Sequence, residues 1–254
     1  MTPSSSLDPW QALATGAEAL GVPLSPAQLE QFRRYTELLL AANQQFNLTA
    51  VRDLPGIIAK LHLDSLSLLP PIAIASGLSM EALRSSMWRV ADVGSGAGIP
   101  GFPLLLACPT LQVAFIESAG KKGEFLRQVA TKLGVEISVA VARAETLGQA
   151  PPHRESFDLV VARAVAETNV LAELTLPLAR LGGIVVLPKG PKAYAELEEA
   201  RPAIKRLGGE VIDLLLIAVP GVEETRTLIL LRKLRSTPPN YPRNPGIPAK
   251  HPIC

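Results

Sequence analysis

One stretch of the sequence decides the fold: Val90-Ala-Asp-Val-Gly-Ser-Gly-Ala-Gly-Ile-Pro-Gly101. Apolar residues run into a glycine-rich turn, and Pro100 or Pro103 is placed to open a following helix. Glycine lets the backbone approach a bound nucleotide closely and adopt a positive φ. The stretch therefore predicts a strand, a ligand-binding turn and a helix, which together begin a nucleotide-binding α/β fold.

The turn matches two cofactor patterns. Gly96-Ala-Gly98-Ile-Pro-Gly101 has the glycine spacing of dinucleotide folds, whereas Asp92-Val-Gly94-Ser-Gly96-Ala-Gly98 is the acidic loop of S-adenosylmethionine enzymes. The carboxylate of Asp92 would repel a pyrophosphate but would attract the ammonium and sulfonium groups of S-adenosylmethionine. We therefore expect S-adenosylmethionine as the cofactor.

Short apolar runs alternate with amphipathic segments from residue 88 to residue 231. This alternation predicts a parallel sheet covered by helices on both faces, and the last two runs, with no long helix between them, predict an antiparallel pair. We expect an α/β, Rossmann-like class I S-adenosylmethionine methyltransferase fold with a seven-stranded, mostly parallel sheet. The expected strands are Trp88–Val93, Gln112–Glu117, Ile137–Val141, Asp158–Ala162, Gly183–Pro188, Val211–Val219 and Thr227–Leu231. The expected helices are Phe102–Ala107, Lys121–Leu133, Ala144–Leu147, Val170–Leu181 and Ala193–Leu207.

The chain divides by composition into three parts. Residues 1–86 form an N-terminal helical extension, 87–235 the cofactor-binding domain, and 236–254 a proline-rich basic tail. Ser25 is a good N-cap for a helix that reaches Asn43, and a second helix from Pro55 is expected to end at Pro70-Pro71. The prolines of the tail argue against regular helix or central strand there.

Composition narrows the class of protein. With 48% hydrophobic and 19% charged residues, the chain is globular. The N-terminus lacks the features of a secretory signal, and the longest apolar stretches look too short to span a bilayer. Cys108, Cys254 and the three histidines lack metal-ligand spacing, so no metal site is expected. We expect a reduced, cytoplasmic protein away from membranes, and a monomer.

Charged residues follow the predicted strands at the edge where open parallel sheets bind ligands. Glu117 ends the second strand, where its carboxylate would accept both ribose hydroxyls. Glu145 follows the third strand, where adenine N6 would need an acceptor. Arg163 follows the fourth, beside the methionine end of the cofactor and the acceptor.

The chain lacks several known methyl-transfer devices. Ala162-Arg-Ala-Val165 stands where enzymes acting on exocyclic amines carry an Asn/Asp-Pro-Pro-aromatic motif, and neither cysteine is placed as a nucleophile. An acceptor that is already nucleophilic, such as guanine N7, needs only proximity and alignment.

Taken together, the segments resemble the ribosomal small-subunit methyltransferase G family, also called glucose-inhibited division protein B. The resemblance covers nearly the whole chain and implies methylation of guanine N7 in 16S ribosomal RNA of the small subunit. It rests on Phe46-Asn-Leu-Thr-Ala-Val-Arg52, His62-Leu-Asp64-Ser65, the glycine loop, Lys121-Lys122 with Phe125-Leu126, Val161-Ala-Arg-Ala164, Lys189-Gly190 and Tyr241-Pro-Arg243.

The resemblance also implies roles for individual residues. The cofactor would be lined by Asp92, Gly94, Gly96, Gly98, Ile99, Glu117, Ser118, Ala119, Ala144, Glu145 and Arg163. RNA would be bound by Asn47, Arg52, Lys121, Lys122, Lys189 and Arg243, with Arg163, His62 and Asp64 as candidates for positioning the acceptor. The N-terminal helices and the tail, including Lys250, would then form the RNA-gripping surface.

Three other functions stay open at this point. A small-molecule methyltransferase would use the N-terminal helices as a lid over the site. An NAD-dependent oxidoreductase is disfavoured by Asp92 and by the antiparallel ending of the sheet. A non-catalytic RNA-binding or ribosome assembly factor could keep the same fold without turnover.

Overall fold

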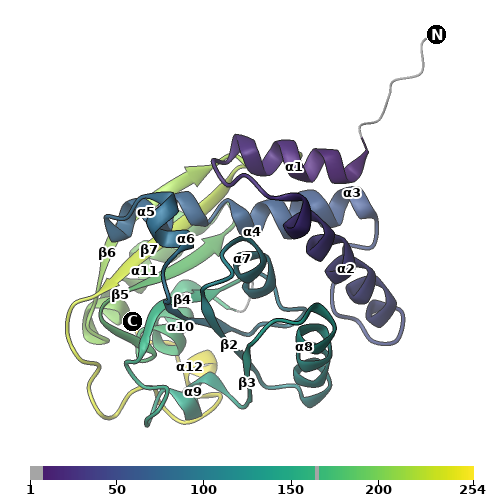
Figure 1. Cartoon of the computed structure of the whole chain (residues 1–254). Coiled ribbons are helices and arrows are strands. Elements are labelled where there is room, and N and C mark those ends of the chain that lie inside the picture. Colours follow the sequence, from purple (N-terminus) through teal and green to yellow (C-terminus); the bar gives the residue numbers. More distant parts are fainter. Residues whose placement is uncertain (1–7, 164–165) are drawn as a thin grey trace.

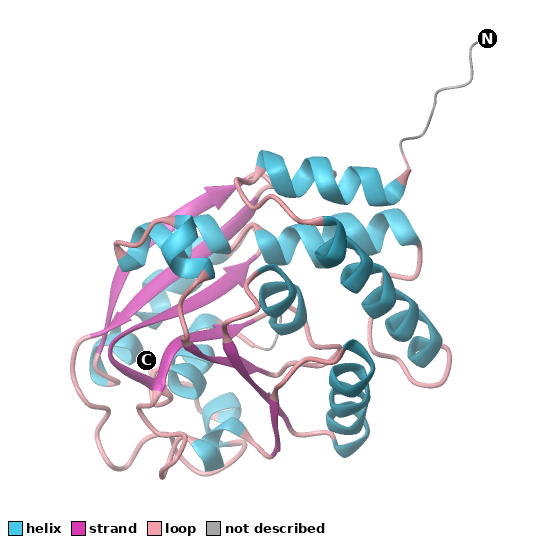
Figure 2. Ribbon diagram, viewed as in Figure 1, coloured by secondary structure: helices cyan, strands magenta, loops and turns pink. Residues whose placement is uncertain are grey.

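The computed structural model describes residues 8–163 and 166–254. It forms three layers, in which a central sheet is covered by helices on both faces (Figure 2). The strand order is β3-β2-β1-β4-β5-β7-β6, and β7 pairs antiparallel with both neighbours. The expected fold class and the antiparallel ending are confirmed. The strands are β1 (Arg89–Val93), β2 (Gln112–Glu117), β3 (Ser138–Val141), β4 (Phe157–Ala162), β5 (Ala179–Lys189), β6 (Gly209–Ile217) and β7 (Arg226–Lys233).

Two buried apolar clusters lie on opposite faces of the sheet, because alternate strand residues point to opposite sides. Val90 and Val161 join the first cluster with the N-terminal helices, α7 (Gly101–Ala107) and α8 (Gly120–Leu133). Ala91 and Val160 join the second, which is covered by α9 (Ala144–Leu147), α10 (Thr168–Thr175) and α11 (Ala193–Arg206). Figure 1 shows the short helix α12 (Ile247–Lys250) close to α9, at the end of the tail.

The N-terminal helices share the first cluster with the sheet. They are α1 (Pro9–Ala19), α2 (Pro26–Asn43), α3 (Leu54–Ile57), the π-helix η1 (Ile58–Leu63), α4 (Asp64–Leu66), α5 (Leu69–Ser76) and α6 (Met80–Arg84). Ser25 caps α2 as expected, because its hydroxyl accepts from Gln28 N at 3.2 Å while the Gln28 side chain accepts from Ser25 N at 2.9 Å. The division of the chain into three parts stays a prediction, since one core joins the first two.

Proline explains three differences from the expected elements. Pro70 and Pro71 do not end a helix but occupy the first turn of α5, where a missing N–H costs little. The helix expected over Val170–Leu181 instead ends at Thr175, just before Pro177, and β5 begins at Ala179. In the tail, Pro248 lies in the first turn of α12, so one helical turn does form there.

The helical run Leu54–Ser76 is long and apolar enough to span a membrane by length and composition alone. This run is longer than the apolar stretches considered from the sequence, because it also includes Lys60, His62 and Asp64. In the structure, 72% of its most apolar window is buried against the rest of the protein.

Candidate active site

The glycine loop leaves β1 and turns sharply into α7. Gly94, Gly96 and Gly98 have φ values of 72°, 54° and 86°, which lie in the left-handed region that favours glycine. A Cβ atom on Gly98 would stand 2.3 Å from the ring of Phe102. The conformation of the loop therefore requires glycine at these positions.

Asp92, at the end of β1, supports this loop from beneath. Its Oδ2 accepts a hydrogen bond from Gly101 N at 2.9 Å, while its buried Oδ1 has no partner among the described residues. Burial raises the pKa of Asp92 from 3.8 to about 7, although the Gly101 N–H and Arg163 act in the opposite direction. A cationic ligand group at the loop would stabilise the ionised carboxylate.

Glu117 joins the end of β2 to the glycine loop. Its Oε2 accepts from Gly96 N at 2.9 Å and its Oε1 accepts from Ala119 N at 2.8 Å. A carboxylate has about four acceptor positions, so both oxygens retain capacity for ribose hydroxyls. The structure therefore places Glu117, Ser118 and Ala119 beside the loop, at the edge expected from the sequence.

Ala144 and Glu145 begin α9, directly after β3, as expected. Both are buried, and Glu145 Oε1 accepts from Gly246 N of the tail at 2.9 Å. The carboxylate therefore already has one partner, which comes from 101 residues further along the chain.

Arg163, after β4, lies against the N-terminal helices. Its Nη2 donates to Lys60 O at 2.7 Å, and its Nη1 is 3.0 Å from Asp64 Oδ2. On the other side, Arg226 Nε donates to Asp64 Oδ1 at 2.9 Å. One buried carboxylate therefore joins a helix, the end of β4 and the start of β7. Ala164, the last residue of the expected Val161–Ala164 motif, and Val165 lie outside the described residues.

Arg226 was missed as a site residue by the sequence reasoning. The antiparallel pairing of β5 and β7 could have identified Arg226, because the start of β7 lies beside the end of β5, where Thr227 pairs with Lys189. Lys189 is itself paired with Glu196 at 2.5 Å and donates to Ala166 O at 2.8 Å. These charged groups lie around a cavity of about 290 Å³. The residues that line it are Asp64, Arg163, Pro188, Lys189, Gly190, Glu196 and Arg226.

The structure contradicts the expected role of His62. The side chain is fully buried among Phe32 and Tyr35, and its Nε2 is 2.7 Å from Thr36 Oγ1. Thr36 donates its own hydrogen to Phe32 O, so His62 Nε2 is the donor in that pair. Burial lowers the pKa of His62 to about 3. Residues two apart lie about 200° apart around a helix, so His62 faces the core while Asp64 faces the site.

Arg243 is also placed differently from the expectation. It forms a forked ion pair with Glu173, a carboxylate that is 1% exposed, at 2.6 Å between Nη2 and Oε2. The guanidinium is therefore committed to the protein and is not available to RNA in this arrangement. Lys250, in contrast, is exposed.

The remaining RNA candidates lie at the surface of the N-terminal half. Asn47 and Arg52 are exposed and contact each other at 3.4 Å. Lys121 is exposed and Lys122 half-buried at the start of α8. Lys121 also borders a groove of about 520 Å³ between α2 and α8.

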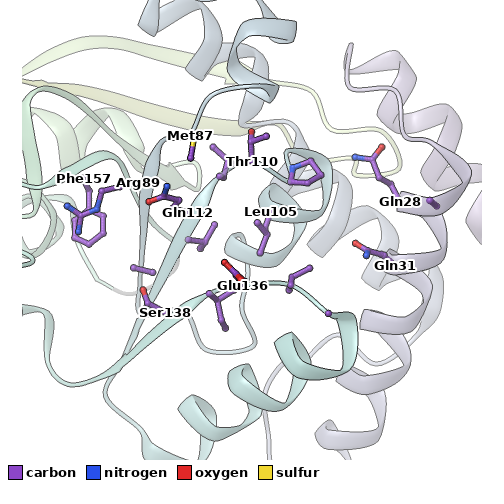
Figure 3. Close-up of a pocket in the computed structure, with 18 of the residues that line it drawn as sticks. Gln28, Gln31, Met87, Arg89, Leu105, Thr110, Gln112, Glu136, Ser138 and Phe157 are labelled. Atoms are coloured by element: carbon purple, nitrogen blue, oxygen red, sulfur yellow. The ribbon is translucent and has the colours of Figure 1, made fainter.

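A larger cavity, of about 930 Å³, lies on the opposite edge of the sheet (Figure 3). Its lining includes Arg89, Gln112, Ser138 and Phe157, which are the first residues of β1 to β4. Ligands in open parallel sheets bind at the carboxyl ends of the strands, so the glycine-loop edge is the better candidate.

Comparisons with known proteins show the family of the chain. The family described as rRNA small subunit methyltransferase G matches residues 28–220. The chain is 47% identical to ribosomal RNA small subunit methyltransferase G of Roseiflexus sp. (strain RS-1), covering 95% of this chain and 98% of that protein. It is 41% identical to the protein of the same name from Pelotomaculum thermopropionicum, covering 96% and 98%.

One solved structure supports the fold alone. The crystal structure of MtNAS in complex with MTA and tNA matches with a TM-score of 0.52 at 15% identity, covering 81% of this chain and 70% of that chain.

Proposed function

This chain belongs to the ribosomal RNA small subunit methyltransferase G family, and we propose that it methylates N7 of a guanine in 16S ribosomal RNA. Methylation of ribosomal RNA with S-adenosylmethionine as donor follows from the family. The guanine atom, the acceptor pocket and the roles of individual residues are the proposal.

The glycine-loop edge fits S-adenosylmethionine. Glu117 lies where a ribose would meet it, and Gly98 has no room for a side chain. The Oδ1 of Asp92 is buried without a partner among the described residues, and the cationic methionine end of the cofactor would stabilise the ionised form that burial disfavours. When bound, the cofactor supplies an activated methyl group on a sulfonium.

The proposal for the acceptor rests on one observation, the cavity of about 290 Å³ that Asp64 lines. It lies beside Arg163, at the carboxyl ends of β4 and β5, and three cations but only two carboxylates line it. This excess of positive charge suits an anionic nucleotide. We place the target guanosine at this cavity, with its N7 facing the methyl group.

Guanine N7 needs no proton removed. With the cofactor bound, the N7 lone pair would take the methyl group as the sulfur–carbon bond breaks, which would leave a neutral thioether and a positively charged base. The protein has to align the two partners and exclude water. Asp64, held between two guanidinium groups, is suited to position Arg163 and Arg226 and not to act as a base.

Asn47, Arg52 and Lys121, which are exposed, and the half-buried Lys122 support a role in holding the RNA backbone. Contacts of this kind provide affinity that falls steeply with salt. The monomeric state and the cytoplasmic location expected from the sequence stay predictions, and sedimentation and fractionation would test them.

The test is methyl transfer from labelled S-adenosylmethionine to small ribosomal subunits from cells that lack this activity, followed by nucleoside analysis. Label in 7-methylguanosine is the expected result, and Gly98→Ala, whose added Cβ collides with Phe102, should abolish it. Label in another nucleoside would refute the N7 proposal. Label in a metabolite alone would favour a small-molecule acceptor.

A further inference from the structure

We propose that the C-terminal tail, residues 237–254, positions Glu145 to recognise the exocyclic amine of adenine in the cofactor. This inference rests on the proposed cofactor site. It gives the tail a role in selecting the cofactor's base, in place of the RNA contact expected for Arg243.

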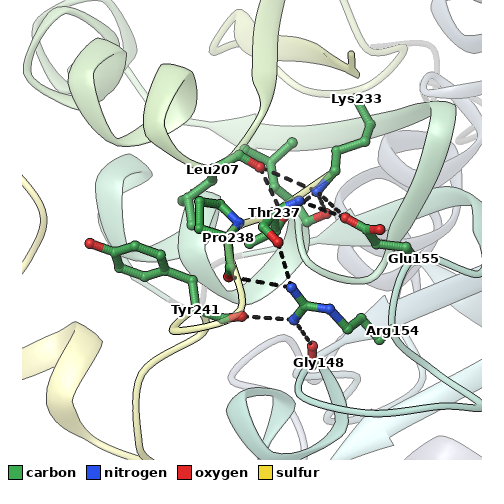
Figure 4. A network of polar contacts seen from close by, with 9 residues as sticks. Gly148, Arg154, Glu155, Leu207, Lys233, Thr237, Pro238 and Tyr241 are labelled. Carbon is green, nitrogen blue, oxygen red and sulfur yellow. Dashed lines mark hydrogen bonds and ion pairs between the residues drawn. The ribbon is translucent and has the colours of Figure 1, made fainter. Parts of the chain in front are cut away.

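The start of the tail is held by a network around Arg154 (Figure 4). Arg154 Nη1 donates to Gly148 O and Tyr241 O, both at 2.7 Å, and its Nη2 donates to Thr237 O at 2.6 Å. Nearby, the fully buried Lys233 donates to Leu176 O at 2.8 Å and pairs with Glu155 at 3.2 Å. Because Gly148 follows α9 directly, Arg154 ties the tail to the segment that carries Glu145.

The middle of the tail is anchored by Arg243. Its Nε and backbone N both donate to Glu173 Oε1, at 2.9 Å and 2.8 Å, and its Nη2 donates to Oε2. Two parallel bonds from a planar guanidinium fix direction as well as distance. The two residues between Arg243 and Gly246 are too few for Gly246 to move far while this pair is intact.

The end of this path is the hydrogen bond from Gly246 N to Glu145 Oε1 at 2.9 Å. Gly246 has a φ of 84°, a left-handed conformation that turns the chain towards Glu145. Within residues 8–163 and 166–254, Glu145 Oε2 has no hydrogen bond. The N–H on Oε1 thus fixes the carboxylate and leaves Oε2 to accept from the amine of adenine.

This geometry predicts a preference between two bases that differ at one position. Adenine carries an amine donor at C6, whereas hypoxanthine carries a carbonyl acceptor that a carboxylate oxygen would repel. A site built to accept a hydrogen bond rejects an analogue that cannot donate one. Disturbing the tail should therefore weaken binding of the adenine form more than binding of the hypoxanthine form.

The experiment measures binding of S-adenosylhomocysteine and of its deaminated analogue, S-inosylhomocysteine, by calorimetry with the full chain. The wild type should prefer the adenine form by about tenfold or more, as expected for a hydrogen bond to a charged group. Glu145→Gln should remove most of that preference. The double variant Glu173→Gln with Arg243→Gln, which removes the buried charge together with its partner, should reduce the preference several-fold. Lys250→Gln, an exposed change in the same tail, should leave it unchanged.

A measurement on the wild type does not depend on how the variants fold. Hydrogen exchange of the Gly246 amide should slow more with S-adenosylhomocysteine than with S-inosylhomocysteine. Equal slowing, or a preference that survives in the double variant, overturns the inference. So does an equal loss of both affinities, which is the signature of a tail that only holds the structure together. A wild type that binds neither compound overturns the cofactor site itself, whereas tight binding without the base preference overturns only the role of the tail.

Discussion

Replacing Asp92 by Asn should make the unliganded protein less sensitive to alkaline pH. The wild-type carboxylate has a pKa raised from 3.8 to about 7 by burial, so the folded state favours its protonated form. The contribution of Asp92 to stability is therefore fully present below about pH 3.8 and is lost as the pH rises through 7.

The pKa difference of about 3 corresponds to up to about 4 kcal/mol, lost by the wild type between pH 4 and pH 8. Asn keeps the acceptor for Gly101 N and cannot ionise. Its amide group would replace the unpartnered Oδ1, and any cost of burying it is the same at every pH.

The assay is urea unfolding of both proteins without cofactor, at pH 5, 6, 7 and 8. The free energy of unfolding of Asp92→Asn, relative to the wild type, should increase steadily across this range. Saturating S-adenosylhomocysteine, whose ammonium group favours the ionised carboxylate, should narrow the difference at pH 8. A difference that is constant with pH would refute the assignment of a raised pKa to Asp92.

Three further predictions concern the acceptor side. His62→Phe should retain methyl transfer within about twofold, because His62 contacts the core. Between pH 7 and pH 5 the free energy of unfolding of the wild type should fall by about 2 kcal/mol, because His62 takes up a proton in the unfolded chain but not in the folded protein, and the variant should not show this fall. A large loss of turnover with normal folding would restore a catalytic role for His62. Arg226→Gln removes one of the two partners of Asp64 and should therefore reduce turnover at least tenfold. Binding of S-adenosylhomocysteine, measured by calorimetry, should stay within about twofold. Unchanged turnover would contradict the proposed acceptor pocket. Lys121→Gln with Lys122→Gln should lower the slope of RNA affinity against salt by about 2, or about 1 for each lysine, measured by filter binding at several ionic strengths. An unchanged slope would mean that neither lysine contacts phosphate.

The sheet could be predicted from the sequence because its signals are local. Continuous apolar runs between helices predicted the strands, and the glycine spacing predicted the sharp turn between β1 and α7. The errors in the expected helix boundaries came from prolines, because the effect of a proline depends on its position in the helix. Pro70 starts α5 and Pro202 lies inside α11, while Pro177 follows the end of α10.

The site could be predicted only as far as the strand ends place it. Asp92 and Glu117 lie at the carboxyl ends of β1 and β2, and Arg163 follows β4, so topology brings them to one edge. The partners of His62 and Arg243 lie 26 and 70 residues away in the sequence, and only tertiary packing decides that one faces the core and the other an internal carboxylate. A charged or titratable residue in a motif therefore does not indicate by itself whether it contacts the ligand or the protein.

The position of β7 has a consequence for synthesis of the protein. β6 pairs only with β7 in the described sheet, and β7, the last strand of the chain, inserts between β5 and β6. In a growing chain, β6 therefore has no strand to pair with until β7 has left the ribosome. Asp64 is synthesised much earlier than its ion-pair partner Arg226, which lies on β7. Chains that end before β7 would lack the strand that holds β6 in the sheet, and they would lack Arg226, which lines the cavity around Asp64. The order of the strands thus makes this cavity one of the last parts of the fold to be completed.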